Sequence, residues 1–156
     1  MIDNTRKTYF SPQDDTLQAF LDFISTAKHT IRIADYSFNL IPLVNLLIEK
    51  HENHVDVQLV LDKSQSTGTT EKPAIAKLKK AHIPFVVGTS DKHQIMHNKF
   101  TILDDAWVQS GSWNYTAAAS DEDNFFDIEH SVERAQAFTN DWQKMFNWIS
   151  KNEANP

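Results

Sequence analysis

The chain has 156 residues, 40% of them hydrophobic and 23% charged, which suits a single globular domain over residues 1–156. Having no cysteine, it cannot form disulfides or thiolate metal sites, and no apolar run approaches the roughly 20 residues of a bilayer-spanning helix. The net charge of −6 argues against a uniformly basic surface, but it is uneven, with +4 over residues 63–82 and −6 over residues 121–133.

The first half of the chain alternates between patterns typical of helices and strands. Ser11 and Pro12 predict that a helix begins there, because serine caps helices and proline suits the first helical position. The polar stretch from Asp62 to Lys72 predicts a loop. The other predicted elements are strands over residues 30–38, 55–61 and 83–87 and helices over residues 42–52 and from Pro73 onward.

The second half adds short strands and a closing helix. The helix is predicted because apolar residues from Ala135 to Ile149 recur along one face. The predicted strands cover residues 100–103, 106–109 and 125–129. Strands that first alternate with helices and then form a hairpin predict an α/β fold, with a mixed β-sheet sandwiched between helices.

The polar residues with the clearest chemical meaning flank a predicted hairpin. They lie in His97-Asn98-Lys99, at Asp104, and in Gly111-Ser112-Trp113-Asn114. A two-residue turn at residues 104–105 would pair Leu103 with Ala106 and His97 with Ser112. Because side chains alternate along a strand, the histidine, the lysine, the serine and Asn114 would then converge on one face.

These groups suit attack on a phosphodiester. A neutral imidazole can attack phosphorus and form a phosphohistidine, or act as a base. Lysine and amide N–H groups can hold the non-bridging oxygens as charge builds. The leaving alkoxide needs a proton from a second acid, yet the His-x-Lys unit occurs once. We therefore expect a homodimer in which two copies of His97 and Lys99 face one phosphate.

The spacing His97-x-Lys99-x4-Asp104, followed by Gly111-Ser112-x-Asn114, resembles the HKD motif of the phospholipase D superfamily. The likeness covers about Ser11 to Trp148 and is strongest to the short bacterial endonucleases that carry one motif per chain. It implies a phospholipase D-like fold and a homodimer whose active site lies on the two-fold axis. It also implies cleavage of single- and double-stranded DNA with little sequence preference and without metal or cofactor.

The resemblance also implies roles for single residues. His97 would be the nucleophile in one subunit and the general acid in the other. Lys99 and Asn114 would bind phosphate oxygens, and Ser112 would support them. These four are the central catalytic candidates.

Three carboxylates are candidates for supporting roles. The family usually has Glu-Asn after the motif, and this glutamate orients the histidine. Here Asp123 precedes Asn124, so Asp123, or Glu122 one residue away, is the expected orienter. Asp104 belongs to the motif, but at a strand end it favours a turn or an ion pair over contact with substrate.

Lys63, Lys72 and Trp113 are candidate substrate-binding residues. The lysines flank a loop that follows a strand end, where α/β sheets often bind ligands, so we expect contact with the DNA backbone. Trp113 could stack on bases, with packing in the core as the alternative. His93 and His97 stand four residues apart, a spacing that favours metal binding only on a helix, so we expect no metal.

The sequence thus predicts a metal-independent endonuclease that binds DNA, with RNA as a further candidate. A phospholipase D acting on lipid phosphodiesters and a weakly catalytic nucleic-acid-binding module are the alternatives. No membrane partner is expected, because no amphipathic helix has a basic face suited to lipid. The polar start from Met1 to Thr8 is unlike a secretory leader, which favours the cytoplasm, or the periplasm or secretion if a leader was removed.

Overall fold

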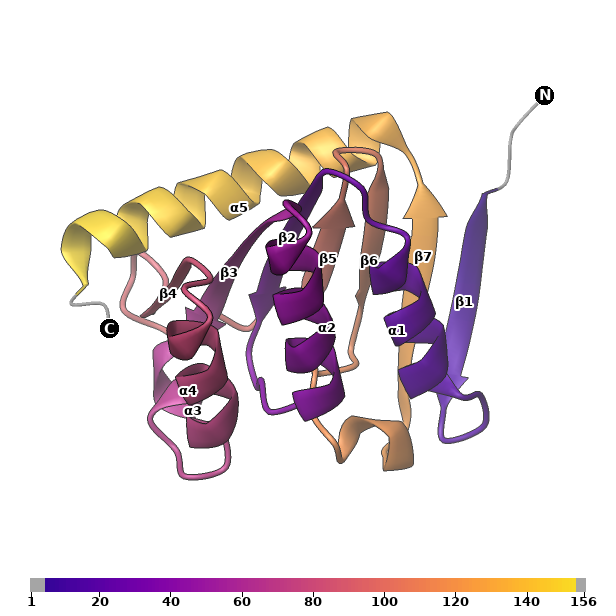
Figure 1. Ribbon diagram of the computed structural model, residues 1–156, viewed down its shortest axis with the longest axis horizontal. Coiled ribbons are helices and arrows are strands. Elements are labelled where there is room, and N and C mark those ends of the chain that lie inside the picture. Colours follow the sequence, from indigo (N-terminus) through magenta and orange to yellow (C-terminus); the bar gives the residue numbers. More distant parts are fainter. Residues whose placement is uncertain (1–4, 154–156) are drawn as a thin grey trace.

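The computed structural model describes residues 5–153, which fold around one seven-stranded mixed sheet (Figure 1). The strand order is β1-β7-β6-β5-β2-β3-β4. Strands β2, β3 and β4 run parallel, and the other neighbours pair antiparallel. The strands are β1 (Arg6–Ser11), β2 (Thr30–Asp35), β3 (Asp56–Asp62), β4 (Phe85–Gly88), β5 (Phe100–Leu103), β6 (Trp107–Gly111) and β7 (Asn124–His130).

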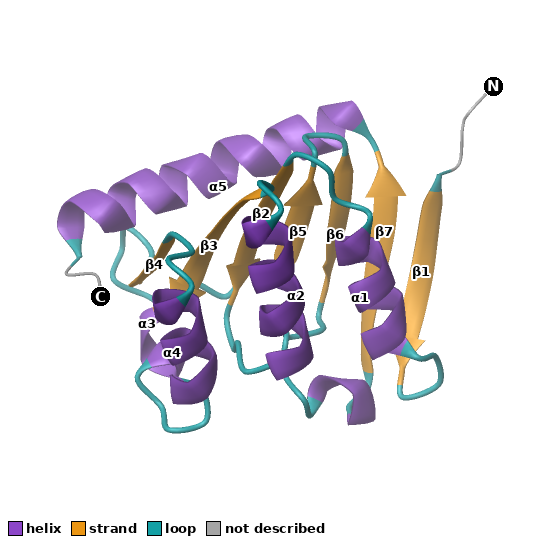
Figure 2. Cartoon of the chain, in the orientation of Figure 1, coloured by secondary structure: helices purple, strands orange, loops and turns teal. Residues whose placement is uncertain are grey.

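Helices cover both faces of this sheet (Figure 2). Helices α1, α2 and α4 contribute to a buried cluster on one face, and the long α5 crosses the other. The predicted mixed sheet sandwiched between helices is therefore confirmed. The helices are α1 (Thr16–Ser25), α2 (Ile41–Glu52), α3 (Lys63–Ser66), α4 (Lys72–Lys80), the 3-10 turn η1 (Ala119–Asp121) and α5 (Val132–Asn152).

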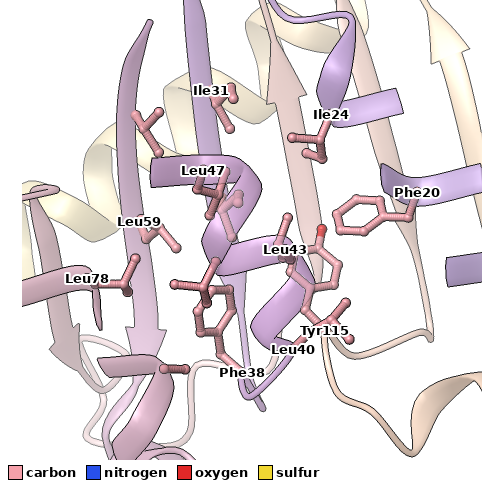
Figure 3. Packing of buried hydrophobic residues seen from close by; sticks show 14 of the residues in the cluster. Phe20, Ile24, Ile31, Phe38, Leu40, Leu43, Leu47, Leu59, Leu78 and Tyr115 are labelled. Atoms are coloured by element: carbon pink, nitrogen blue, oxygen red, sulfur yellow. The ribbon is translucent and has the colours of Figure 1, made fainter. Parts of the chain in front are cut away.

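The larger hydrophobic core lies between the sheet and helices α1, α2 and α4 (Figure 3). Phe20 of α1 packs against Tyr115, with ring centroids 4.5 Å apart, and both residues are fully buried. Leu43 and Leu47 supply the buried side of α2. Each large side chain of this kind stabilises the fold by about 1.5–3 kcal/mol when it leaves water. This core fixes the positions of the strand ends that carry the motif.

Helix α5 forms the second core as its periodicity predicted. Ala135, Trp142 and Ile149 are its buried residues. The indole N–H of Trp142 donates a 2.8 Å hydrogen bond to the carbonyl oxygen of Ile33, which ties the helix to β2. Within residues 5–153, no helix combines the length and apolar character that crossing a membrane requires.

The start of the chain differs from the prediction. Ser11 ends the edge strand β1, which was not predicted, and α1 begins at Thr16 instead of at Ser11. Ser11 is only 2% exposed and is held within the sheet. The true cap is Asp15, whose carboxylate accepts a 3.1 Å hydrogen bond from the Gln18 N–H.

Other predicted elements are present with shifted ends. The strand predicted over residues 30–38 ends at Asp35. The predicted loop after β3 contains the one-turn helix α3, because Asp62 caps it by accepting a 3.2 Å hydrogen bond from the Gln65 N–H. This cap gives the polar stretch a fixed shape beside the motif.

The β5–β6 hairpin has a different register from the predicted one. Leu103 pairs with Trp107 instead of Ala106, so the connection is one residue longer. Asp104 and Asp105 both have a φ of 54°, a left-handed conformation that aspartate adopts more readily than most residues. The predicted pairing is therefore wrong by one residue.

Candidate active site

All the motif residues except Asp104 lie at one edge of the sheet, where strand ends meet. Strands β2 and β3 end at this edge, at Asp35 and Asp62, and β5 begins there at Phe100. His97 and Lys99 occupy the segment that leads into β5. The carboxyl ends of parallel strands are a common position for ligand sites. The fold therefore presents the motif where binding loops usually gather.

His97 and Lys99 are in direct contact. Lys99 Nζ lies 3.3 Å from His97 Nε2 and donates a 2.8 Å hydrogen bond to the His97 carbonyl oxygen. His97 is exposed, whereas Lys99 is only 9% exposed. Burial lowers the pKa of Lys99 below its ordinary value, although the nearby Asp35 charge acts to raise it. The ammonium is thus held beside the imidazole in a partly dry position.

Side chains from the two neighbouring strand ends hold His97 in place. The Asp62 carboxylate accepts a 2.8 Å hydrogen bond from the N–H of Met96, the residue before the histidine. The Tyr36 ring meets the His97 ring edge-on, with centroids 4.7 Å apart. The Tyr36 hydroxyl oxygen accepts a 3.0 Å hydrogen bond from Gln65 Nε2. Sequence reasoning gave these supporting residues no role: Asp62 stood at the start of a predicted loop, but Tyr36 fell inside the strand predicted over residues 30–38.

Asn114 is fixed beside the same segment. Its Oδ1 accepts a 3.1 Å hydrogen bond from the N–H of Ser37, so its Nδ2 hydrogens remain the donors that can face a ligand. Ser37 directly follows Tyr36, whose ring contacts His97. Asn114 therefore stays with the motif in spite of the shifted hairpin register.

Ser112 joins the site and also ties β6 to β7. Its hydroxyl donates to Asn124 Oδ1 at 3.0 Å and accepts from the Phe125 N–H at 3.1 Å. A hollow of about 400 Å³ opens at the ends of β5 and β6. Its lining includes His97, Lys99, Ser110, Ser112 and Phe138. The histidine, the lysine and the serine therefore face one open space, although they are not in the predicted pairs.

A second cavity, of about 650 Å³, lies between the segment before β5 and helix α5, and we call it the α5 cavity. Ile95, which is 49% exposed, and Trp148 supply apolar walls, and Asn98 supplies an amide. The Trp148 ring packs edge-on against His93, with centroids 5.8 Å apart. His97 lines this cavity too, so a group bound there would lie next to the imidazole.

Neither predicted orienting carboxylate contacts His97 in this structure. Glu122 Oε1 accepts a 3.2 Å hydrogen bond from Asn124 Nδ2, and Asp123 is exposed beside Ser112. Between residues 5 and 153, no hydrogen bond or ion pair joins a carboxylate to the histidine. The contacts to its ring come from a tyrosine and a lysine instead. The orienting role of these acids stays a prediction.

Asp104 lies at the opposite edge of the sheet from the other motif residues. Its carboxylate accepts hydrogen bonds of 2.7 to 3.3 Å from the backbone N–H groups of Lys28, His29 and Thr30. Burial raises the pKa of Asp104, but the three donors outweigh it and the pKa is lowered overall. The carboxylate thus anchors the chain ahead of β2, in line with the structural role that its place at a strand end favoured, and a catalytic role for Asp104 stays a prediction.

The three predicted substrate-binding residues have different surroundings. Trp113 is fully buried and packs against Phe20 with ring centroids 5.2 Å apart, so it cannot stack on a base and the packing alternative holds. Lys63 forms a 3.2 Å ion pair with Glu153. Lys72 is exposed at the start of α4. Of the three, Lys72 is best placed to meet an anionic ligand.

Besides the buried Asp62, two more buried carboxylates lie beneath the motif and were not predicted. Asp35 is fully buried, and Glu71 is 3% exposed. Glu71 Oε1 accepts hydrogen bonds from the Phe38 N–H at 2.9 Å and from the Ser37 hydroxyl at 3.1 Å. Burial raises the pKa of both acids above the ordinary value. The sequence signal for Asp35 was an acid that interrupts an otherwise apolar strand.

The described residues contain no ready metal site. Across residues 5–153, no three histidine, aspartate or glutamate side chains are grouped so that they could hold an ion. His93 and His97 lie in a loop, not on one face of a helix. The groups that the described residues do bring together at this edge are an imidazole, an ammonium and an amide.

Comparison with known proteins identifies the class that this fold and site define. Residues 20–149 match the family described as "Cardiolipin synthase, PLD-like domain". The chain therefore belongs to this family of phospholipase D-like domains, as its HKD motif predicted.

Individual relatives give the same result. The chain is 31% identical over 137 residues to a phospholipase D of Rickettsia bellii, covering 86% of this chain and 66% of the relative. It is 28% identical over 115 residues to a mitochondrial cardiolipin hydrolase of Chlamydomonas reinhardtii, covering 74% and 50%. The chain thus spans from half to about two thirds of these curated relatives.

A solved structure matches over a larger share of its length. Nuc from Salmonella typhimurium, described as a phospholipase D family member, superposes with a TM-score of 0.85 at 28% identity. The match covers 93% of this chain and 95% of Nuc. The predicted likeness to a phospholipase D family member of similar length is confirmed.

Proposed function

We propose that the chain is a metal-independent endonuclease that hydrolyses single- and double-stranded DNA through a phosphohistidine on His97. The contact between His97 Nε2 and Lys99 Nζ, 3.3 Å apart beside an open hollow, carries this proposal. A protonated lysine only donates hydrogen bonds, so Lys99 can bond to Nε2 in the His97 tautomer whose proton is on Nδ1. When a phosphate oxygen of the substrate takes that hydrogen bond instead, the Nε2 lone pair is free to attack phosphorus.

The first step transfers the phosphoryl group to the enzyme. His97 Nε2 attacks phosphorus, the bond from phosphorus to the leaving oxygen breaks, and its electron pair stays on that oxygen. Lys99 and the amide hydrogens of Asn114 stabilise the charge that builds on the non-bridging oxygens. The departing alkoxide takes a proton from a general acid.

The general acid is the His97 of a second copy of the chain. One chain offers a single His-x-Lys unit, and no carboxylate contacts the histidine among residues 5–153. In a two-fold dimer the second imidazole, having given up its proton, then accepts one from water. That water attacks phosphorus and breaks the bond to nitrogen, which regenerates both histidines.

The surroundings of His97 favour a nucleic acid as substrate. The α5 cavity has the size of a ligand site and combines the flat Trp148 ring with the amide of Asn98. Rings and amides of this kind bind nucleobases by stacking and hydrogen bonding. The exposed Lys72 can meet a backbone phosphate nearby.

A lipid phosphodiester is the second candidate substrate. Its specific support is that the matched family is described as a cardiolipin synthase domain and that relatives are named phospholipase D and cardiolipin hydrolase. The same imidazole and lysine would attack the lipid phosphate in the same way. The two substrates differ only in the groups that flank phosphorus.

The decisive experiment compares wild type with His97→Ala on two substrates in excess EDTA. We expect wild type to nick plasmid DNA and leave phosphatidylcholine vesicles intact, with nicking lost in His97→Ala. His130→Ala, which removes an exposed histidine at the other end of the strands from the motif, is the matched control and should remain active. Lipid turnover without nicking would establish the second candidate, and DNA binding without cleavage would establish a binding module.

Assembly is tested separately. Sedimentation should show a dimer at concentrations at which the enzyme is active. Mixing and reassembling wild type with excess His97→Ala should then reduce wild-type activity, because mixed dimers hold one imidazole at the shared site. An active monomer would rule out the shared-site mechanism.

A further inference from the structure

Asp35 stands opposite Lys99 across two neighbouring strands. In the antiparallel pair of β2 and β5, Ala34 faces Phe100. One further step along the same register brings Asp35 level with Lys99. Facing residues of antiparallel strands project to the same side of the sheet, with Cβ atoms about 4.5–5.5 Å apart. The backbone alone therefore brings this carboxylate close to the motif lysine.

A positively charged neighbour would stabilise the ionised form of the Asp35 carboxyl group. The residue is fully buried, and its Oδ2 accepts one long hydrogen bond, 3.3 Å, from the Tyr115 N–H. In the described part of the chain, its Oδ1 has no hydrogen-bond partner. A carboxylate in such a position is costly unless a positive charge lies close by.

The direct contacts of the Lys99 ammonium are with neutral groups. The ammonium contacts the His97 carbonyl oxygen, the His97 ring and, at 5.3 Å, the face of the Tyr36 ring. These partners carry no negative charge. A buried ammonium among neutral groups tends to lose its proton. Burial lowers the pKa of Lys99, and the charge of Asp35 opposes that effect.

Glu71 is the other acid that faces this region, from the start of α4. Its Oε1 is already bonded to the Ser37 hydroxyl and the Phe38 N–H. Burial raises the pKa of Asp35 most, and the Glu71 charge raises it further, whereas the hydrogen bond from the Tyr115 N–H and, after it, the Lys99 charge lower it. Lys99 is thus the cation that favours the ionised form of Asp35, and within residues 5–153 no ion pair joins Glu71 to the lysine.

We propose that Asp35 is the counter-ion of Lys99 and a positioning residue for the reaction, an inference that rests on the proposed function. Within residues 5–153 no direct ion pair joins the two groups, so Asp35 acts through its charge, which keeps the buried lysine protonated beside His97 Nε2, where a phosphate oxygen must bind. The pair carries no net charge. The substrate is then held by directed hydrogen bonds from Lys99 and Asn114 and not by an unbalanced positive field.

The pairing itself is tested by a thermal-stability cycle that needs no activity. Wild type, Asp35→Asn, Lys99→Met and the double variant are melted at pH 7. Each single substitution leaves one buried charge without its partner. The fall in Tm of the double variant should therefore be smaller than the sum of the two single falls, by about 3 °C or more. Losses that simply add would overturn the proposal.

A second cycle supplies the matched control. Asp62 is equally buried at the end of the next strand, but its carboxylate is bonded to Met96, Ser64 and Gln65. The falls in Tm caused by Asp62→Asn and by Lys99→Met should therefore add in the double variant. Coupling as large as that of Asp35 would mean that any buried acid at this edge responds to the lysine, and the specific pairing would be wrong.

The role in the reaction is read from the pH dependence of kcat/KM on a synthetic phosphodiester. Asp35→Asn keeps the acceptor for Tyr115 but removes the charge that raises the pKa of Lys99. The alkaline limb of the profile should move about one pH unit lower. A uniform loss with an unchanged profile would overturn the role in the reaction. If wild type cleaves no phosphodiester, the proposed function fails while the stability cycle still decides the pairing.

Discussion

The Asp62 carboxylate binds both the start of α3, through the Gln65 N–H, and the residue before the motif histidine, through a 2.8 Å hydrogen bond from the Met96 N–H. One side chain thus holds together a helix cap and the loop that presents His97. The position of the imidazole depends on a residue that does not contact substrate.

Asp62→Ala should therefore lower kcat strongly while it lowers the free energy of unfolding only moderately. Loss of the cap costs about 1 kcal/mol, but a displacement of His97 by about 1 Å costs on the order of a hundredfold in kcat. Ser131→Ala is the matched control, because it removes the cap of α5 next to the β5–β6 turn, at the other end of the strands from His97. Melting curves and kcat on a synthetic phosphodiester give both quantities, and equal activity losses in the two variants would contradict the positioning role.

The Tyr36 ring should matter more than its hydroxyl. Tyr36→Phe keeps the edge-on contact with His97 and loses only the hydrogen bond from Gln65, so its kcat should stay within about threefold of wild type, a net change of ~0.5 kcal/mol. Tyr36→Ala frees the imidazole and should lower kcat by about tenfold or more. Comparable losses in both variants would show that the hydroxyl, not the ring, is the important group.

Asp104→Ala should destabilise the fold and leave the activity of the folded protein unchanged. Three backbone N–H groups lose their acceptor, at a cost of about 1 kcal/mol or more. Because the pKa of Asp104 is lowered in the folded state, its stabilisation is present above the ordinary carboxyl pKa. The stabilisation is lost as the pH falls through the lowered value.

This prediction is checked by melting wild type and Asp104→Ala from pH 7 downward, with kcat measured at pH 7. The stability difference between the two proteins should shrink below about pH 4. A large fall in kcat of the fully folded Asp104→Ala variant would show that Asp104 takes part in catalysis.

Trp148 should affect binding of substrates that carry a base. Trp148→Ala removes the aromatic wall of the α5 cavity and should raise KM for a dinucleotide by roughly tenfold, as expected for a lost base stack. Trp148→Phe should retain most of the binding. Methyl p-nitrophenyl phosphate is the control substrate, and an equal rise in its KM would show that the cavity does not recognise a base.

The hairpin shows where sequence reasoning about the site succeeded and where it failed. Residue types and spacing were enough to group His97, Lys99 and Ser112, which face one hollow. The predicted turn itself is present, because Asp104 and Asp105 adopt the positive φ that it requires and the Ala106 N–H bonds to the Leu103 carbonyl oxygen. The register was wrong because Ala106 stays outside the ladder and Trp107 pairs with Leu103 in its place. The grouping survived because a hollow at the end of two strands can be reached from either register.

The supporting residues were harder to predict, because their roles come from contacts distant in sequence. Asp62 bonds to Met96, 34 residues later. The edge strand β1 was missed because most of its side chains are exposed and it shows no apolar alternation. The periodicity of α5, by contrast, located its buried face correctly, since one strong apolar stripe suffices for a helix.

Because the sequence contains no cysteine, a single cysteine introduced at the edge of the sheet away from the motif allows the quaternary structure to be measured. Glu52 is exposed at the end of α2, on the side where β3 begins and away from the motif. Glu52→Cys would create one thiol per chain, since the sequence contains no other. Spin labels attached there would report one inter-subunit distance in a two-fold dimer and none in a monomer, and any change in that distance when DNA is added would measure movement between the subunits.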